Sequence, residues 1–209
     1  CFPAKLTHSH ILNLEGKGVD RIFLPYVVYE RQGSGQNCFN CPIVTGYSDV
    51  IRSSMKLSVP LDSPAITFKD KKALHRQIKE YLSGLGVKTS VINKAFRIAL
   101  EAYAAYEKDI ADANREVYNQ TLRNGQLVIL LGGRPYHSDP LIQHKLAEMV
   151  SALGVNCITD DIVRGLDIDI TDVHYMSQWS FPEHILKAAK WAAMQGPEVQ
   201  FVELTSFGC

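Results

Sequence analysis

Three short apolar segments, separated by helical patterns, constrain the fold of this chain more than any other feature. Residues 126–131, 155–159 and 199–204 read QLVILL, VNCIT and VQFVEL, and the first is the continuous apolar run typical of a strand buried on both faces of a parallel sheet. Between them we predict two helices. One begins at Ser138 or Asp139, with Pro140 in its first turn and Leu141 on its apolar face, and the other covers residues 183–194. Such alternation implies right-handed parallel crossovers and predicts a doubly wound sheet.

The first ninety residues contain the same kinds of element on a smaller scale. We predict helices over residues 4–14 and 48–55, and a third helix that Asp70 caps and that continues to residue 81. Strands are predicted over residues 19–24 and 65–68, where β-branched and aromatic side chains gather. This region is therefore predicted to be a second α/β lobe.

A long helix is predicted between the two regions. From residue 90 to about residue 121, apolar side chains recur every three or four positions, which places them on one face of a helix. The predicted fold class is therefore α/β, with two Rossmann-like or flavodoxin-like lobes of mainly parallel sheet joined by this helix. The corresponding domains are an N-terminal lobe over residues 1–89, the connecting helix over residues 90–124 and a C-terminal lobe over residues 125–209.

The composition excludes several classes of protein. Lys and Arg total 22, as do Asp and Glu, so the formal net charge is zero and nonspecific binding to nucleic acid or to an anionic membrane surface is not expected. Hydrophobic residues make up 46% of the chain, enough to build a core. No run approaches the roughly 18 apolar residues of a membrane-spanning helix. We therefore expect a globular protein with neither nucleic-acid nor membrane partners.

The cysteines indicate the cellular compartment. There are five of them, an odd number and too few for a disulfide framework in a chain of this length, which favours the reducing cytoplasm. The chain lacks an initial Met and both begins and ends with Cys. We therefore interpret it as a piece of a longer protein.

The segment Cys38-Phe-Asn-Cys41-Pro42 is the sharpest local motif. Two thiolates three positions apart in a loop can bind one metal ion or cluster, and the following proline stiffens the exit from the loop. Three interpretations stay open: a structural pair of cysteines, a metal or cluster site, and a redox dithiol. Zinc would need two further ligands, for which the sequence offers His8 and His10 but no second Cys-x-x-Cys.

The positions of the other cysteines strengthen the cluster interpretation. Cys209 follows the last predicted strand, and open α/β sheets bind ligands outside the carboxyl ends of their strands. Cys38 and Cys41 also follow a strand, and Cys1 precedes a helix. Cys157 differs, because it lies inside an apolar strand and is interpreted as a small buried hydrophobic residue.

A second candidate site is the turn that follows the strand at residues 126–131. Backbone N–H groups and a helix start could hold an anion there, with two hydrogen bonds from the Arg134 guanidinium. A tight structural turn is the alternative, and the turn has neither a Walker nor a dinucleotide-binding pattern. Further along, Asp160 and Asp161 are interpreted as part of a solvated loop. We predict that the following residues bind a ligand: Gly132, Gly133, Arg134, Tyr136, His137 and Asp139.

Five segments carry a resemblance to a known family. They are Cys1-Phe-Pro-Ala-Lys-Leu-Thr-His-Ser-His10, Val19-Asp-Arg-Ile-Phe-Leu-Pro25, Asn37-Cys-Phe-Asn-Cys-Pro42, Gly133-Arg-Pro-Tyr-His-Ser-Asp-Pro140 and Ser206-Phe-Gly-Cys209. The chain resembles the activases of CoA-substrate-specific enzymes, in the region of those large proteins that is related to 2-hydroxyacyl-CoA dehydratase subunits. The resemblance runs nearly end to end, and it does not include the actin-like ATPase portion.

This resemblance implies a cofactor and its ligands. Related dehydratase subunits hold a 4Fe-4S cluster with three cysteines from separate loops, and the cluster serves low-potential electron transfer linked to 2-hydroxyacyl-CoA dehydration. Carried over to this chain, the expected ligands are Cys1, Cys41 and Cys209, with Cys38 as a spare or fourth ligand. The implied partners are an ATPase activator module, of the same or another chain, and an acyl-CoA substrate.

A second class of function remains as the alternative. The chain would then be a non-catalytic docking or scaffold module, with a structural or zinc-binding Cys-x-x-Cys motif. Two of the implied ligands lie at chain ends, where ordering is poor, so the isolated chain can lack the cluster. The sequence shows neither an ATP site nor an evident general base, so we expect no turnover by this chain alone, and whether it is part of an enzyme stays open.

Overall fold

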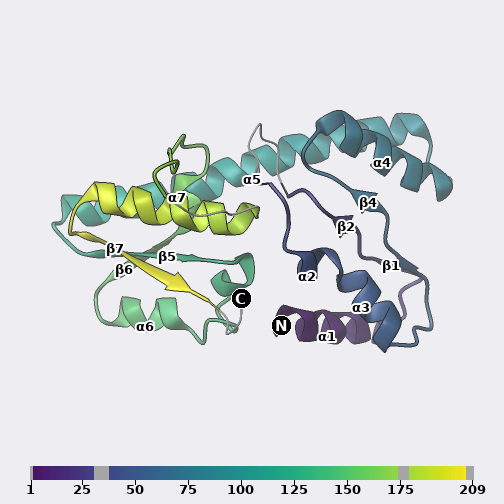
Figure 1. The fold of residues 1–209 in the computed structure, drawn as a ribbon, viewed down its shortest axis with the longest axis horizontal. Helices are drawn as coiled ribbons and strands as arrows, with labels where there is room; N and C mark the ends of the chain where they lie inside the picture. The colour runs from purple at the N-terminus through teal and green to yellow at the C-terminus, as the bar shows by residue number, and fades with distance from the viewer. Residues whose placement is uncertain (1, 31–37, 174–178, 206–209) are drawn as a thin grey trace. The chain divides into compact units, whose positions relative to one another are not determined.

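The computed structural model describes residues 2–30, 38–173 and 179–205 of the 209-residue chain. It divides into two compact units. Unit 1 comprises residues 1–98 with 178–180 and 208–209, and unit 2 comprises residues 99–177 and 181–207. The described residues form seven α-helices and small parallel sheets, which confirms the predicted α/β fold class (Figure 1).

Unit 1 is built around two extended segments that pair in parallel. The segments contain β1 (Ile22–Phe23) with β2 (Tyr26–Val27), and β3 (Leu61–Asp62) with β4 (Ala65–Ile66). Every pair joins residues 39 positions apart, as in 22 with 61 and 26 with 65. Pro25 and Pro64 fall at the same position of this register and interrupt it, because proline has no N–H to donate. The two short sheets are therefore one interrupted parallel pair.

Helices lie on both faces of this pair. They are α1 (Phe2–Gly16), α2 (Pro42–Thr45), α3 (Tyr47–Ser54) and α4 (Lys71–Gly84). Ile11 of α1, Ile22 of β1 and Ile51 of α3 form the buried core on one face. On the other face the Tyr81 ring of α4 stacks at 5.2 Å from the Phe23 ring. As predicted, Asp70 caps α4, where its carboxylate accepts a hydrogen bond from an N–H of the first turn.

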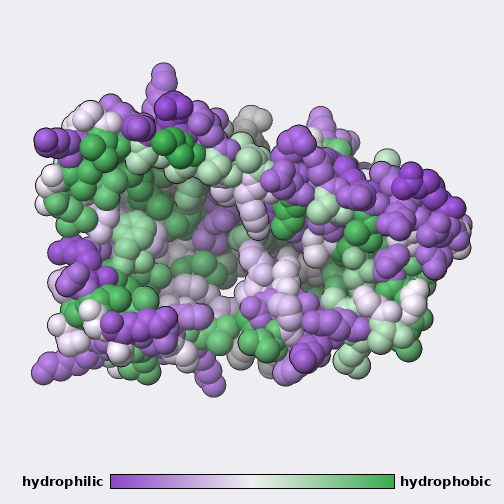
Figure 2. All heavy atoms as spheres, turned by 180° about the vertical axis from the view of Figure 1, so that it is seen from behind, coloured by the Kyte–Doolittle hydropathy of each residue, from purple (hydrophilic) through white to green (hydrophobic). Residues whose placement is uncertain are grey.

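Two paired strands leave apolar side chains of unit 1 uncovered. Leu12, Phe23, Ile43 and Val91 are all exposed despite their size. Figure 2 shows hydrophobic surface in a hollow of this unit, between α4 and the helices α1 and α3. Buried apolar residues of unit 1 lie on the α4 side as well, where Ile66, Leu74 and Ile92 are at most 6% exposed.

Helix α5 (Thr89–Arg123) is continuous and confirms the predicted long helix. The division between the two compact units falls inside it, between Ile98 and Ala99. The domain limits predicted near residues 89 and 124 correspond to the ends of α5 rather than to this division. Among the described residues, no helix combines the length and the apolar character needed to cross a bilayer.

Unit 2 contains the predicted parallel sheet, in the order β6-β5-β7. Its elements are β5 (Val128–Gly133), the short 3-10 helix η1 (Pro135–Ser138), α6 (Leu146–Ala152), β6 (Asn156–Thr159), η2 (Asp160–Val163), α7 (Ser180–Gln195) and β7 (Val199–Leu204). Helices α6 and α7 cover opposite faces of the sheet (Figure 1). Val128, Leu130 and Ile158 of the strands form a core with Ala188 and Ala192 of α7.

The helix predicted to begin at Ser138 or Asp139 was placed too early, because α6 begins only at Leu146. The Asp139 carboxylate does accept hydrogen bonds from the N–H groups two and three residues later. The turn does not propagate into a helix, since His144 and Lys145 have φ values of 54° and 60°, in the left-handed region. Leu141 consequently has 80% of its surface exposed and does not lie on a buried helix face.

Candidate functional site

The Cys-x-x-Cys segment of unit 1 is extended and held on both sides. Phe39 forms an antiparallel bridge with Tyr29 and a parallel bridge with Trp179. The Phe39 ring also lies 4.7 Å from the Tyr29 ring. Residues 38–40 therefore form the central segment of a small ribbon, and α2 begins at Pro42, after Cys41. Backbone pairing therefore holds the segment with the two cysteines, which was predicted to be a loop.

Both cysteines of this ribbon are free thiols. Cys38 is buried, with 2% of its surface exposed, whereas Cys41 is half-buried and stands at the start of α2. Side chains alternate between the two faces of an extended segment, so Cys38 and Asn40 share one face and Phe39 lies on the other. Cys1 and Cys209, the other two predicted ligands, lie outside the described residues. The structure thus places two of the four predicted ligands on one ordered segment.

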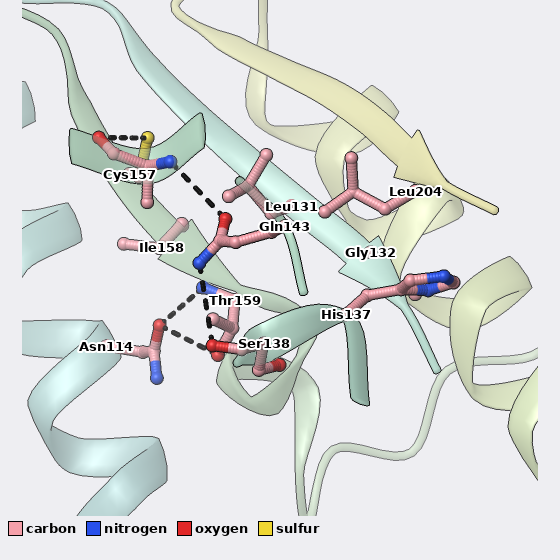
Figure 3. A pocket seen from close by; sticks show the side chains of 12 residues that line it. Asn114, Leu131, Gly132, His137, Ser138, Gln143, Cys157, Ile158, Thr159 and Leu204 are labelled. Carbon is pink, nitrogen blue, oxygen red and sulfur yellow. Dashed lines mark hydrogen bonds between the residues drawn. The ribbon is translucent and has the colours of Figure 1, made fainter. Parts of the chain in front are cut away.

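Unit 2 contains a cavity of about 210 Å³ where β5 and β6 end. Figure 3 shows the side chains that line it. Open α/β sheets bind ligands at this edge, but the volume is below the roughly 300 Å³ of most small-molecule pockets. Three predicted ligand-binding residues, Gly132, Gly133 and His137, line the cavity, whereas Arg134, Tyr136 and Asp139 lie outside its lining. The remaining lining residues are Asn114, Leu131, Ser138, Gln143, Ala147, Cys157, Ile158, Thr159 and Leu204.

The two glycines at the end of β5 are explained by packing. A Cβ at Gly132 would lie 2.5 Å from Cε2 of the Phe201 ring. A Cβ at Gly133 would lie 2.8 Å from Nδ1 of His137 and 3.0 Å from the Leu204 carbonyl oxygen. The distances of 2.5 and 2.8 Å are shorter than real Cβ contacts allow, so neither position can hold a side chain without movement of its neighbours. Close approach of a phosphate group is not needed to account for this pair.

His137 is buried and helps to hold the turn. Its Nδ1 accepts a hydrogen bond of 3.0 Å from the Arg134 N–H, which requires that nitrogen to be unprotonated. The Tyr136 ring lies 4.3 Å from the imidazole. Burial, followed by the nearby Arg134 charge, lowers the pKa of His137 below its usual value. The ring is therefore neutral near pH 7 and acts as an acceptor within the turn.

The backbone donors predicted to hold an anion are used within the protein. The Gly133 N–H donates to the Asp160 carboxylate at 3.4 Å, and the Arg134 N–H donates to His137. The two N–H groups that follow Asp139 in the turn donate to its carboxylate. A bound anion would have to displace these acceptors, so the geometry favours the structural interpretation of the turn.

Asp160 was interpreted as part of a solvated loop, which is wrong, since its side chain is buried. It follows β6, and its Oδ2 lies 4.0 Å from Nε2 of His184, the fifth residue of α7. Burial, and then the adjacent Asp161 carboxylate, raises the pKa of Asp160 to about 7. The sequence offered one signal of this burial, a carboxylate directly after a predicted buried strand. Hydropathy alone, however, did not indicate that the residues of η2 would cover the Asp160 side chain.

Asp161 belongs to a network that ties η2 to α5. Its carboxylate accepts hydrogen bonds from Arg164 Nε and from the Thr159 hydroxyl. Arg164 also forms an ion pair with Glu107 of α5 at 3.0 Å. The Asn114 side chain of α5 accepts from the Thr159 N–H at 2.6 Å. Ligand atoms of Asp160, Asp161 and His184 lie within 4.8 Å of one another, but the Arg164 guanidinium already supplies the cation that balances Asp161.

Cys157 lies in β6 of unit 2, and its thiol faces the Ala147 carbonyl at 4.0 Å. Burial raises the pKa of Cys157, which keeps the thiol protonated and unreactive. Cys157 is half-buried and lines the cavity, so it is less buried than its position in an apolar strand predicted.

The family of the chain follows from a comparison of its sequence with known families. A family model described as the CoA enzyme activase uncharacterised domain matches residues 1–163. The chain belongs to this family. The match confirms the predicted relationship to activases of CoA-substrate-specific enzymes, and it contains both the Cys-x-x-Cys ribbon and the turn after β5. No curated protein and no solved structure matches the chain.

Proposed function

We propose that this CoA enzyme activase domain binds an iron–sulfur cluster for low-potential electron transfer linked to 2-hydroxyacyl-CoA dehydration. The observation that carries the proposal is the ribbon that holds Cys38 and Cys41 as two free thiols on one ordered segment. Cys1 and Cys209 are the proposed further ligands. Together these cysteines would provide the four thiolates that a 4Fe-4S cluster uses.

The donor set of the ribbon fits such a cluster. Thiolates are the ligands that iron–sulfur clusters require, and neither cysteine is consumed by a disulfide. The buried position of Cys38 would shield one ligand from solvent, which helps to protect a cluster that water and oxygen attack. When bound, the cluster would supply one-electron transfer, and the protein's own contribution is to orient the two thiols and to exclude water from Cys38.

The partners belong to the same proposal. Membership of an activase family supports a partner enzyme module, for which we propose an ATPase activator in the same or another chain, in the cytoplasm. We further propose that the cavity at Gly132 and His137 accepts a small polar group of an acyl-CoA substrate. Its volume of about 210 Å³ suits such a small group better than a whole nucleotide.

The test is the iron and acid-labile sulfide content of the chain after anaerobic reconstitution, in wild type, Cys38→Ala and Cys41→Ala. Cys157→Ala is the matched control, because it removes a described thiol that lies outside the ribbon. We expect about four irons for each chain in wild type and in the control, with iron lost from both ribbon variants.

Other outcomes would favour the alternative function. Stoichiometric zinc without sulfide would identify a zinc-binding docking module, and a folded chain without metal would identify a structural pair of cysteines. Equal iron content in Cys41→Ala and Cys157→Ala would also refute the proposed ligands. Circular dichroism of every variant separates loss of iron from loss of fold.

A further inference from the structure

The polar side chain between the two cysteines of the ribbon is buried without full use of its hydrogen-bonding groups. Asn40 has only 8% of its surface exposed. Its backbone N–H donates to the Val28 carbonyl at 2.7 Å, which fixes its main chain within the ribbon. The use that the protein makes of each atom of the Asn40 side chain is therefore informative.

The two ends of the Asn40 amide behave differently. Oδ1 accepts a hydrogen bond of 3.0 Å from the Cys41 N–H. In the described part of the chain, Nδ2 donates to no acceptor. The side chain therefore holds the backbone of one cysteine with its acceptor and keeps two N–H donors beside it.

Cysteines lie close to Asn40 along the ribbon. Cys38 is on the same face of the ribbon as Asn40, because residues two apart in an extended segment point the same way, and it is the more deeply buried cysteine. Cys41 is the next residue. Thiolates and inorganic sulfides are the acceptors that a cluster would bring to this position, and hydrogen bonds to cluster sulfurs are one of the factors that set its reduction potential.

We infer that Asn40 is a positioning residue for the proposed cluster, orienting Cys41 through Oδ1 and donating from Nδ2 to a cluster or cysteine sulfur. The inference rests on the proposed function and adds a residue that is not itself a ligand. A donor to sulfur stabilises the added negative charge of the reduced cluster. Loss of that donor should therefore make reduction less favourable.

Two variants separate the roles of the two amide ends. Asn40→Asp keeps an oxygen that can accept the Cys41 N–H and replaces the donor with a second acceptor. Asn40→Leu is uncharged and removes both functions, so it controls for the charge that Asp adds. Asn93→Asp is the matched control, since Asn93 is an exposed residue of α5 whose Oδ1 is hydrogen-bonded to His75.

The measurement is the midpoint potential of the reconstituted chain, by redox titration followed by electron paramagnetic resonance, with iron content determined on the same samples. We expect both Asn40 variants to retain iron and to show a tenfold smaller equilibrium constant for one-electron reduction, about 59 mV more negative. Asn93→Asp should match wild type.

The outcomes distinguish the inference from the proposed function. A wild-type chain that binds iron, with unchanged potentials in Asn40→Asp and Asn40→Leu, overturns only the role of Asn40. Loss of iron from folded Asn40→Asp also overturns it, because that variant keeps the acceptor for the Cys41 N–H. A wild-type chain that assembles no cluster refutes the proposed function as well.

Discussion

Asp160 offers the sharpest test of the electrostatics of unit 2. Its carboxyl group is buried after β6, and burial together with Asp161 raises its pKa from 3.8 to about 7. Between about pH 4 and pH 7 the folded chain therefore holds a proton that the unfolded chain has released. Stability must then fall as the pH rises through this window, by up to about 1.4 kcal/mol for each pH unit.

The substitution Asp160→Asn removes this loss of stability at higher pH, because asparagine does not ionise, and it keeps an oxygen that can accept the Gly133 N–H. A pKa moved from 3.8 to about 7 corresponds to about 4 kcal/mol at about 1.4 kcal/mol for each pH unit. We expect the variant to be more stable than wild type by about that amount at pH 8 and equal to it below pH 4. Urea unfolding followed by circular dichroism at several pH values from 4 to 8 measures both the difference and its slope.

Asp161→Asn is a control that should change the stability in the opposite direction. It removes the neighbouring charge, but it also removes the ion pair with Arg164 and one of the two oxygens that accept from Arg164 and Thr159, so it should lower stability at pH 7. The reasoning is refuted if Asp160→Asn is less stable than wild type at pH 8, or if its stability declines between pH 4 and pH 7 as steeply as that of wild type.

Two further predictions concern packing and use the same urea assay at one pH. The Ser48 side chain is buried and, within the described residues, its hydroxyl has no hydrogen-bond partner, so Ser48→Ala should raise stability by about 1 kcal/mol; a loss of stability would indicate a partner for the hydroxyl. Gly132→Ala should cost about 1–3 kcal/mol, because its Cβ would overlap the Phe201 ring. Gly84→Ala, at the open end of α4 where a Cβ meets nothing within 4 Å, should be neutral or stabilising, and equal effects of the two glycine substitutions would contradict the packing argument.

The sequence predicted those parts of the fold that depend on local pattern. The strand over residues 199–204 has the predicted bounds, and α5 extends the predicted helix by only one or two residues at each end. The exact 39-residue register of the parallel pair in unit 1 could not be predicted, because it depends on contacts between segments far apart in the chain. The late start of α6 was missed because the left-handed conformations of His144 and Lys145 leave no mark on hydropathy.

The candidate site could be predicted only in its residue types. The Cys-x-x-Cys spacing pointed to Cys38 and Cys41, but the ribbon that holds Cys38 also pairs with Trp179, which is distant in sequence. Asn40 was passed over because a polar residue in a polar loop gives no signal until its burial is known. The anion site predicted at Arg134 came from a turn pattern, whereas the hydrogen bonds of that turn are made within the protein.

The most direct test of the central claim, that the ribbon binds an iron–sulfur cluster, is the electron paramagnetic resonance spectrum of the reconstituted and reduced chain. Wild type and Cys157→Ala should show the same signal of a reduced 4Fe-4S cluster, and Cys41→Ala should lose it or replace it with a signal of a cluster with fewer irons. An identical spectrum in Cys41→Ala, or a folded wild-type chain with neither iron nor signal, would contradict the claim.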